Sequence, residues 1–317
     1  MRFGDGGNYG IIREMEARCR GLSLMSGGLD SQLAIRVLQS AGAYVEAVCF
    51  ATPFFDCSRA MSAAKGLGVK LHVVDFTDDE ILLIKDPPHG FGGAMNPCID
   101  CHALMIRRAG ELMERLGYDF IATGEVQGQR PMSQNRQSLA TVEKSSGMKG
   151  RLVRPLSAKL LEPTIPETEG KLDRERLLDI AGRGRERQIA LAAEFGITDY
   201  PSPAGGCKLT EDGFCRKLRD LQEHEGLDNR RLVELLTIGR RFRLPGGSSV
   251  LLGRDRRENE VLRKESGEVI AIAGVPGPTA LVPDVKSESD LEIAKGIVRA
   301  WSRGGTGREQ YKEYQIC

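Results

Sequence analysis

The sequence lacks the features of a membrane or exported protein. It has no run of 18 apolar residues without a charge, and its N-terminal residues contain no apolar segment of signal-peptide length. We therefore predict a cytoplasmic protein with no membrane partner. Because thiols are kept reduced in that compartment, a closely spaced pair among the eight cysteines is more typical of catalysis, metal binding or redox chemistry than of a disulfide scaffold.

The sequence also lacks a substantial net charge of either sign. Its 45 Lys and Arg residues nearly balance its 44 Asp and Glu residues, which leaves a formal charge of +1. No global field therefore draws the protein to nucleic acid, and any basic surface has to be local. The 317 residues, 40% of them hydrophobic and 28% charged, are typical of a soluble globular protein with two or three domains.

The first half of the chain alternates short apolar runs with amphipathic stretches, which predicts strands followed by helices. The predicted strands are 21–25, 44–50, 70–76 and 119–125, and the helices between them are 32–41, 59–67 and 98–116. This β-α-β-α order predicts an α/β fold with a doubly wound, mostly parallel sheet. Ligands are then expected at the carboxyl ends of the strands.

The second half is less regular. We expect a mobile loop at 143–150, one or two helices at 171–195, further helix at 213–236 and a small β-rich or α+β domain at 238–317. The predicted domains are a catalytic domain over 1–225, with a helical extension at 170–225, and a smaller domain over 226–317.

One segment between the first predicted strand and helix has the composition of a phosphate loop. It reads SLMSGGLDSQLA, with the turn at residues 26–31. Glycines allow the backbone to turn tightly, so that consecutive N–H groups and the helix N-terminus can bind an anion. The hydroxyls of Ser26 and Ser31 add donors, and the Asp30 carboxylate is suited to hold a magnesium ion on the phosphate. A plain glycine turn is the alternative, and neither GxxxxGK[ST] nor GxGxxG is present.

The string SGGLDS resembles the SGGxDS signature of the PP-loop ATP pyrophosphatases. This resemblance implies an adenine nucleotide alpha hydrolase-like fold that binds ATP and Mg²⁺ and cleaves ATP between its α and β phosphates to adenylate a substrate. It assigns to the nucleotide Ser26, Gly27, Gly28, Asp30 and Ser31, with Asp30 also catalytic. Further matches place Phe50, in CFATPF, near the adenine and place Thr123 and Gly124, in ATGE, around the nucleotide. The segment RPLSA at 154–158 also matches.

A second segment places two thiols one helical turn apart. It reads NPCIDCH, in which Asn96 is a suitable N-cap and Pro97 a suitable first helical residue. Cys98 and Cys101 are then expected on one face of the first turn, where the helix dipole favours thiolates, which act as nucleophiles and metal ligands. The spacing alone fits haem attachment, zinc, a disulfide, an iron–sulfur cluster or sulfur transfer. The lack of an export signal argues against haem and the disulfide.

Residues 96–125 resemble the corresponding part of tRNA 2-thiouridine synthases, in which an NPxxxC helix precedes an ATGH strand. Glu125 stands where many of these relatives have histidine. Related thiolases with a CxxC pair and a distant third cysteine hold a [4Fe–4S] cluster. The resemblance therefore implies Cys98, Cys101 and Cys207 as catalytic residues and metal ligands, with zinc or a metal-free persulfide relay as alternatives.

The other cysteines have weaker assignments. Cys215 competes with Cys207 as the distant thiol, and His102 is interpreted as a packed neighbour of the pair rather than a ligand. We assign four cysteines to packing or exposure without function: Cys19, Cys49, Cys57 and Cys317.

The C-terminal part contains a local excess of positive charge. Residues 230–264 hold 10 Lys or Arg against 4 Asp or Glu. The arginines suited to phosphate contacts are Arg240, Arg241, Arg243, Arg254, Arg256 and Arg257. No aromatic stacking platform accompanies them, and a solvated basic face is the alternative. The strings LLGRDRRENEVLRK and AIAGVPGPTALVP resemble the NFACT-R domain, which implies RNA binding.

Together these patterns predict an ATP-dependent tRNA sulfurtransferase that forms AMP and pyrophosphate. It would adenylate a base carbonyl and replace the oxygen with sulfur, with tRNA or another RNA and a sulfur donor as partners. A homodimer is compatible with the sequence, which does not determine the oligomeric state. The alternatives are a PP-loop enzyme acting on a small molecule and an RNA-binding protein with a vestigial ATP fold.

Overall fold

The computed structural model describes residues 17–202 and 206–316 of the chain. The chain divides into two compact units, residues 1–92 with 96–206 and residues 93–95 with 207–317. Within the described ranges, no helix is long and apolar enough to cross a membrane.

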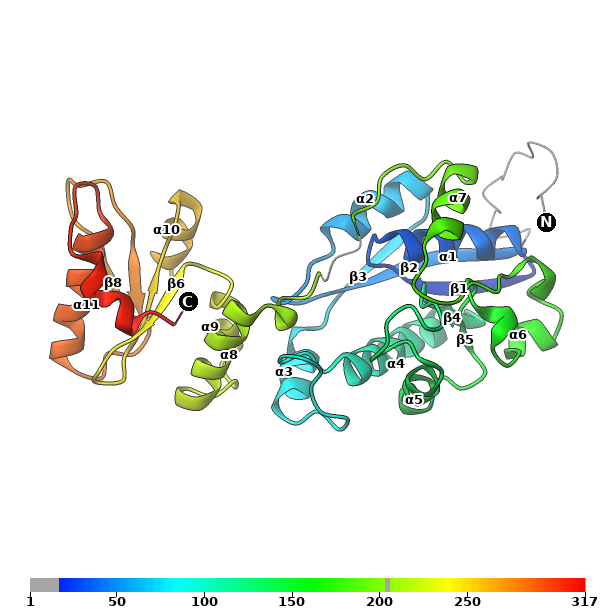
Figure 1. Ribbon diagram of the computed structural model, residues 1–317, viewed down its shortest axis with the longest axis horizontal. Helices are drawn as coiled ribbons and strands as arrows, with labels where there is room; N and C mark the ends of the chain where they lie inside the picture. The colour runs from blue at the N-terminus through cyan, green and yellow to red at the C-terminus, as the bar shows by residue number, and fades with distance from the viewer. Residues whose placement is uncertain (1–16, 203–205, 317) are drawn as a thin grey trace. The chain divides into compact units, whose positions relative to one another are not determined.

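The first unit contains a five-stranded parallel sheet (Figure 1). Its strands are β1 (Cys19–Leu24), β2 (Ala43–Ala51), β3 (Leu71–Asp75), β4 (Phe120–Ala122) and β5 (Leu152–Val153). They lie in the order β3-β2-β1-β4-β5, and every neighbouring pair is parallel. The predicted doubly wound sheet is therefore confirmed.

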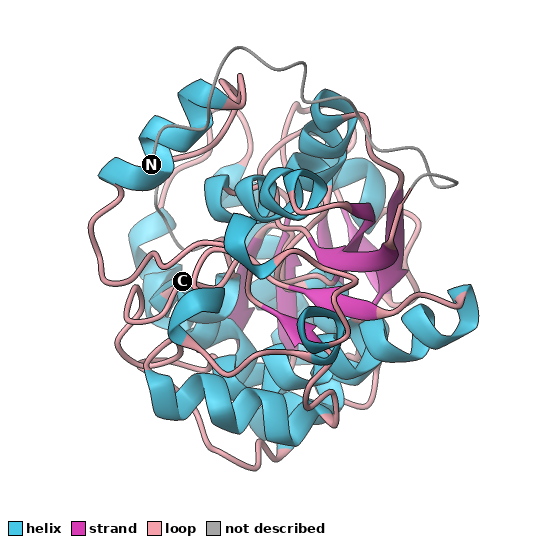
Figure 2. Cartoon of the chain, turned by 90° about the vertical axis from the view of Figure 1, so that its right-hand side faces the viewer, coloured by secondary structure: helices cyan, strands magenta, loops and turns pink. Residues whose placement is uncertain are grey.

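Helices cover both faces of this sheet (Figure 2). They are α1 (Leu29–Ser40), α2 (Ser58–Leu67), α3 (Thr77–Lys85), α4 (Cys98–Leu116), α5 (Arg136–Ser146), α6 (Ile165–Thr168) and α7 (Glu186–Glu194). One core contains Leu33 and Val37 of α1, and a second contains Ile106 and Met113 of α4. The two cores follow from strands that are apolar on both faces, as buried parallel strands are.

The order of the strands reverses between β1 and β4. The chain runs outward from β1 through β2 to β3, and then returns to add β4 on the other side of β1. Gly21 permits this pairing, because a Cβ there would lie 2.3 Å from the Phe120 ring of β4. In open α/β sheets, ligands bind beyond the carboxyl ends of the two strands at such a point. The loops after β1 and β4 therefore define the candidate site.

Two local predictions in this unit were wrong. Residues 143–146 of the expected mobile loop form the last turn of α5, which Gly147 ends with a left-handed conformation. The helix expected from residue 171 begins only at Glu186, and a short 3₁₀ turn at Arg174–Arg176 precedes it. The arginine-rich composition of this stretch did not distinguish helix from ordered loop.

The second unit is an α+β domain, as predicted. An antiparallel sheet in the order β6-β7-β9-β8 contains β6 (Arg240–Arg243), β7 (Ser249–Leu252), β8 (Glu268–Ile270) and β9 (Ala280–Val282). Its helices are α8 (Asp212–His224), α9 (Arg230–Leu235), α10 (Arg256–Leu262) and α11 (Glu288–Trp301). Phe242 and Trp301 meet edge to face in its core, at 5.6 Å between ring centroids.

Candidate active site

The loop after β1 has the hydrogen bonds of an ordered anion-binding turn. Gly27 has a φ of +80°, which favours glycine, and Gly28 precedes the first residue of α1. The Gly28 N–H donates to Ser26 Oγ at 3.3 Å, and Ser31 Oγ donates to the Gly28 carbonyl at 2.8 Å. The predicted phosphate-loop residues therefore lie together at the N-terminus of α1, where the N–H groups of a first helical turn have no acceptor within the helix.

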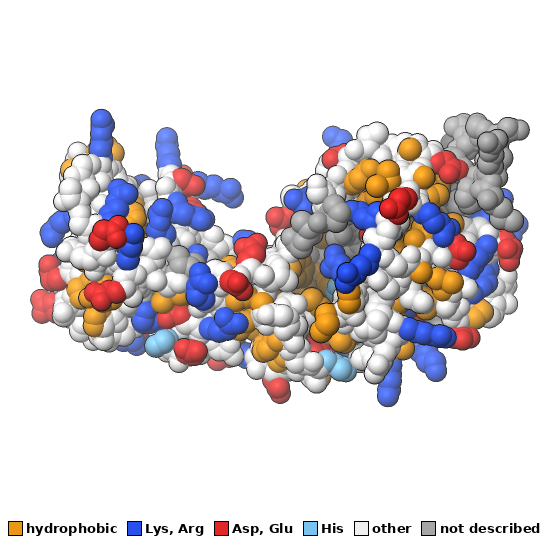
Figure 3. Space-filling view, viewed as in Figure 1, with side chains coloured by type: hydrophobic (Ala, Val, Ile, Leu, Met, Phe, Trp, Pro, Cys, Tyr) orange, Lys and Arg blue, Asp and Glu red, His pale blue; other side chains and the backbone are white. Residues whose placement is uncertain are grey.

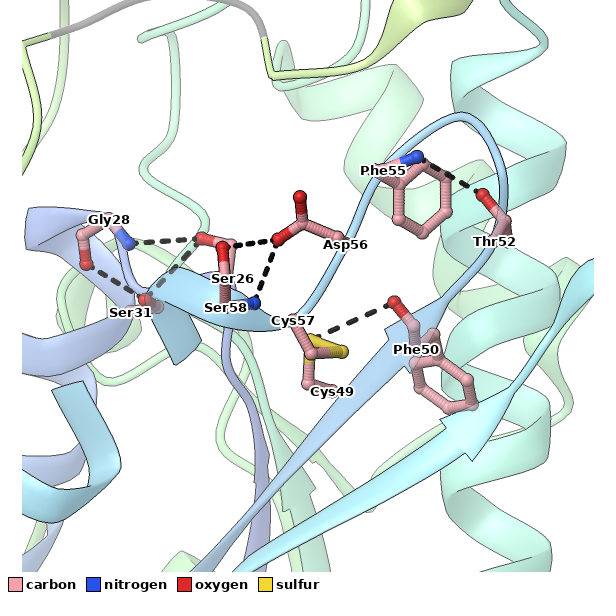
Figure 4. The surroundings of a disulfide bond; sticks show 10 residues. All are labelled: Ser26, Gly28, Ser31, Cys49, Phe50, Thr52, Phe55, Asp56, Cys57 and Ser58. Atoms are coloured by element: carbon pink, nitrogen blue, oxygen red, sulfur yellow. Dashed lines mark hydrogen bonds between the residues drawn. A yellow bond between two sulfur atoms is a disulfide. The ribbon is translucent and has the colours of Figure 1, made fainter. Parts of the chain in front are cut away.

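Two glycines let neighbouring backbones approach this loop. A Cβ on Gly27 would lie 2.5 Å from the carbonyl carbon of Arg59 in α2. A Cβ on Gly124, after β4, would lie 2.6 Å from the carbonyl carbon of Asp30. The predicted ATGE segment thus packs directly on the phosphate loop, and Figure 4 shows Ser26 and Gly28 beside the loop that leads into α2.

Asp30 is mostly buried and only partly satisfied. Its Oδ2 accepts a hydrogen bond from Gln129 Nε2 at 3.1 Å, whereas its buried Oδ1 has no donor among the described residues. Burial raises the pKa of Asp30, and the amide of Gln129 and the guanidinium of Arg185 oppose this rise. A carboxylate oxygen left without a donor beside a phosphate loop fits the oxygen ligand that Mg²⁺ requires.

Glu125 is the centre of a buried charge network. Its carboxylate contacts Arg154 Nε at 2.9 Å, Thr123 Oγ1 at 3.0 Å and His102 Nδ1 at 3.2 Å. Burial alone would raise the pKa of Glu125, but the Arg154 guanidinium and His102 lower it to about 2. Glu125, which stands where the ATGH pattern has histidine, is therefore an ionised partner of the His102 imidazole. This pairing supports the interpretation of His102 as a packed neighbour of the cysteine pair rather than a metal ligand.

The two thiols of NPCIDCH lie in the first turn of α4, as predicted. Cys98 is partly exposed and Cys101 is 7% exposed. The predicted N-cap was wrong, because α4 begins at Cys98 and Pro97 occupies the cap position without a capping side chain. Asn96 instead donates from Nδ2 to Cys98 Sγ at 3.2 Å. Hydrogen bonds to sulfur tune thiolate-bound clusters, so this donor set fits two ligands of an iron–sulfur cluster.

The third thiol, Cys207, belongs to the second unit. Residues 17–202 and 206–316 contain no group of three or more His, Cys, Asp or Glu side chains that could hold a metal ion. The three-cysteine site therefore stays a prediction. Its competitor Cys215 is fully buried and donates to the Leu209 carbonyl at 3.2 Å, as a packed structural thiol does.

Phe50 lies near the end of β2, but its side chain faces the core. It is 4% exposed and meets the Phe76 ring at 5.2 Å between centroids. Its ring is therefore packed in the core, and a contact of this residue with adenine would be made by its backbone.

The assignment of Cys49 and Cys57 to simple packing was wrong, because the two are joined by a disulfide (Figure 4). Their Cα atoms lie 6.0 Å apart, since the chain turns back from β2 into α2 over only eight residues. No pattern in the sequence indicated this pairing. The bond joins β2 to the N-terminus of α2, the helix that packs on Gly27.

The predicted arginine cluster of the second unit is largely engaged in ion pairs. Arg241, 2% exposed as a side chain, contacts Asp220 at 2.7 Å and Glu225 at 3.0 Å. Arg243 pairs with the same two carboxylates at 2.8 and 2.7 Å. Figure 3 shows Lys and Arg side chains interspersed with Asp and Glu on this unit. The proposal that all six arginines contact phosphate was therefore wrong for these two.

Comparison with known protein families divides the chain in the same way. The family described as "Thiamine biosynthesis protein (ThiI)" matches residues 17–159, and the family described as "NFACT protein RNA binding domain" matches residues 239–314. These matches confirm the resemblance of the first part of the chain to PP-loop enzymes of tRNA thiolation and of the last part to the NFACT-R domain.

Several curated relatives match part of the chain. A "Probable tRNA sulfurtransferase" of Thermoanaerobacter sp. (strain X514) is 32% identical over 42% of this chain and 35% of its own length. Another with that name, from Caldanaerobacter subterraneus subsp. tengcongensis, is 29% identical over 53% of this chain and 41% of its own length. A "tRNA-specific 2-thiouridylase MnmA" of Cutibacterium acnes is 33% identical over 32% of this chain and 33% of its own length. The chain thus spans about a third to two fifths of these relatives.

Among solved structures, a 4-thiouridine synthetase in complex with RNA and ATP is 19% identical, with a TM-score of 0.39 over 69% of this chain and 53% of its own. The sequence matches are the stronger finding, and they agree with the sheet order and the phosphate loop. Residues 17–159 are therefore similar to the ThiI family and have a PP-loop fold, and residues 239–314 are similar to the NFACT RNA-binding domain.

Proposed function

We propose that the protein is an ATP-dependent tRNA sulfurtransferase that adenylates a base carbonyl and replaces its oxygen with sulfur. The observation that carries this proposal is a continuous set of contacts from the phosphate loop to the thiols. The Asp30 backbone touches Gly124, the next residue Glu125 binds His102, and His102 follows Cys101 in α4. Activation by ATP and attack by sulfur then take place on one edge of one sheet.

The nucleotide is assigned to the loops after β1 and β4. Ser26, Gly27, Gly28 and Ser31 would hold the phosphates through N–H and hydroxyl donors, and Thr123 with Gly124 would close the site. Asp30 would hold Mg²⁺, which would neutralise charge on the phosphates during displacement.

The reaction consists of two substitutions. The carbonyl oxygen of the base attacks the α-phosphorus, the bond to the bridging oxygen breaks, and its electron pair leaves with pyrophosphate. A sulfur nucleophile then attacks the activated carbon, and AMP leaves with the original oxygen. Donors fixed in advance lower both barriers because they require no reorganisation as charge develops.

Cys98, Cys101 and Cys207 are assigned as the thiolate ligands that would hold a [4Fe–4S] cluster. When bound, the cluster would carry the sulfide that is transferred. The Cys98 thiol, with its amide donor, and the adjacent Cys101 thiol support this assignment. A sulfur donor supplies the atom, and zinc or a metal-free persulfide relay is the alternative chemistry.

The second unit is assigned to binding of the RNA, because it contains the segment of the NFACT family. The names of the curated relatives support tRNA as that RNA. A tRNA substrate is also consistent with a cytoplasmic location and is compatible with a homodimer.

The test is iron and acid-labile sulfide analysis of anaerobically purified wild type, Cys98→Ala, Cys101→Ala and Cys207→Ala, with Cys215→Ala as the matched control. We expect iron in the wild type and in the control, and loss of iron in the other three. Equal iron in all five proteins would refute the three-cysteine site.

The same proteins, incubated with ATP, sulfide and total tRNA, should form thionucleosides detectable by mass spectrometry after digestion. Iron-free wild type that transfers sulfur from a persulfide donor, with the S–S bond broken by a second cysteine, but not from sulfide favours the persulfide relay. Pyrophosphate release that does not depend on tRNA favours a small-molecule substrate.

A further inference from the structure

The segment from Ala181 into α7 lies beside the candidate site although it is outside both family matches. Gly182 donates its N–H to the carbonyl of Gln127 at 2.8 Å, and Ala181 forms a β-bridge with the same residue. Gln32 of α1 ties the end of the segment down, because its Nε2 donates to the carbonyls of Gly27 and Asp199 at 3.0 Å each. The segment is therefore fixed against the loops after both β1 and β4.

The first turn of α7 brings two unsatisfied polar side chains to this place. Gln188 is fully buried, yet neither Oε1 nor Nε2 has a hydrogen-bond partner within residues 17–202 and 206–316. The Nε of Arg185 is also buried and has no acceptor in the same ranges. Buried donors without acceptors are costly, so such a pair indicates a group that binds there.

Both side chains belong to the segment that packs on α1, whose first turn contains Asp30. Burial raises the pKa of Asp30. The Arg185 guanidinium, the Gln188 amide and the exposed Arg130 all lower this pKa against the effect of burial, which agrees with their lying near the carboxylate. The buried Oδ1 of Asp30 has no donor either. Three incomplete groups from two elements therefore face one position at the start of α1.

The phosphate loop needs a cation that it does not contain. Residues 26–31 include no Lys or Arg, whereas pyrophosphate carries several negative charges. A guanidinium offers N–H donors in a planar fork that matches phosphate oxygens, and an amide adds a further donor. Arg185 is the cation in this position whose donor is both buried and unused.

We propose that Arg185 and Gln188 form, with the phosphate loop, the subsite for the β- and γ-phosphates of ATP. This inference rests on the proposed function and adds residues to its nucleotide site. As the α,β bridging oxygen takes the electron pair of the breaking bond, the Arg185 guanidinium stabilises the charge on the departing pyrophosphate.

The test measures binding to the full-length protein by calorimetry, with three probes: ATP methylated at the α,β bridge so that it is not cleaved, inorganic pyrophosphate, and AMP. The variants are Arg185→Met and Gln188→Met. Arg187→Met is the matched control, because Arg187 is in the same turn but is exposed and paired with Asp179 at 2.6 Å.

We expect Arg185→Met to weaken binding of the ATP analogue and of pyrophosphate by at least about tenfold and to leave AMP binding unchanged. Gln188→Met should weaken the same two probes by a smaller factor, Arg185→Lys should restore part of the loss, and Arg187→Met should resemble the wild type.

Two results would overturn the inference. The first is equal affinity of the wild type and the Arg185→Met variant for the ATP analogue and for pyrophosphate, in an experiment in which the wild type binds both. The second is a loss of affinity in Arg185→Met that is equally large for AMP and is accompanied by a lower melting temperature. Arg185 would then be a structural partner of Asp30. Wild type that binds no adenine nucleotide would refute the proposed function itself, and this subsite with it.

Discussion

Two buried groups of charged side chains, one in each unit of the chain, have their charges balanced to different degrees. In the second unit, Arg241 and Arg243 both pair with the same two carboxylates, so that two positive charges meet two negative ones. Among the described residues, only Nη1 of Arg241 in this cluster is buried without an acceptor. In the first unit, Asp30 keeps a buried oxygen without a donor, and Gln188 beside it has no partner among the described residues. A cluster whose charges balance stabilises a fold, whereas a buried carboxylate oxygen without a donor leaves room for a ligand.

The largest expected effect comes from removing one charge of the balanced cluster. Arg241→Ala leaves Asp220 and Glu225 with too few partners in a buried setting, and we expect it to lower the free energy of unfolding by about 3–5 kcal/mol. The fluorescence of Trp301, the only tryptophan of the chain, reports urea unfolding of this unit. An unchanged free energy of unfolding would mean that this cluster does not stabilise the second unit.

A second prediction concerns acid and the buried Glu125. Its folded pKa of about 2 lies below the value near 4.3 of an unfolded glutamate, so its stabilisation is present above about pH 4.3 and is lost as the pH falls towards 2. We expect Glu125→Gln to cost about 3 kcal/mol at pH 7, and this difference to shrink in acid. Calorimetric melting of both proteins across this range checks it, and a gap that does not depend on pH would contradict the assigned charge.

The smallest expected effect belongs to an exposed arginine. The Arg256 side chain is 92% exposed and pairs with Glu260 one turn away at 2.9 Å. Arg256→Ala should change the free energy of unfolding by less than about 0.5 kcal/mol. If Arg256 contacts RNA, the salt dependence of RNA affinity should become shallower by about one phosphate contact. A loss in the free energy of unfolding as large as that of Arg241→Ala would contradict the expectation that exposed arginines stabilise the fold less than buried ones.

Local patterns predicted much of the fold and the first half of the site. Alternating apolar runs located every strand from β1 to β4, and SGGLDS located the phosphate loop. Pairing across long sequence separations was not predictable. The disulfide between Cys49 and Cys57, the pairing of Arg241 with Asp220 and the position of Arg185 near Asp30 all depend on how distant elements pack.

The most direct test of the central claim is a paired measurement on Asp30→Asn. Burial of the Asp30 charge opposes folding, so the isosteric amide should melt at the same or a higher temperature than the wild type. With ATP and total tRNA, wild type should release pyrophosphate, and we expect the variant to lose this release by a factor on the order of 10² or more. Equal release by both folded proteins, or a variant that simply unfolds, would contradict the account of Asp30 as an incomplete, ligand-binding group.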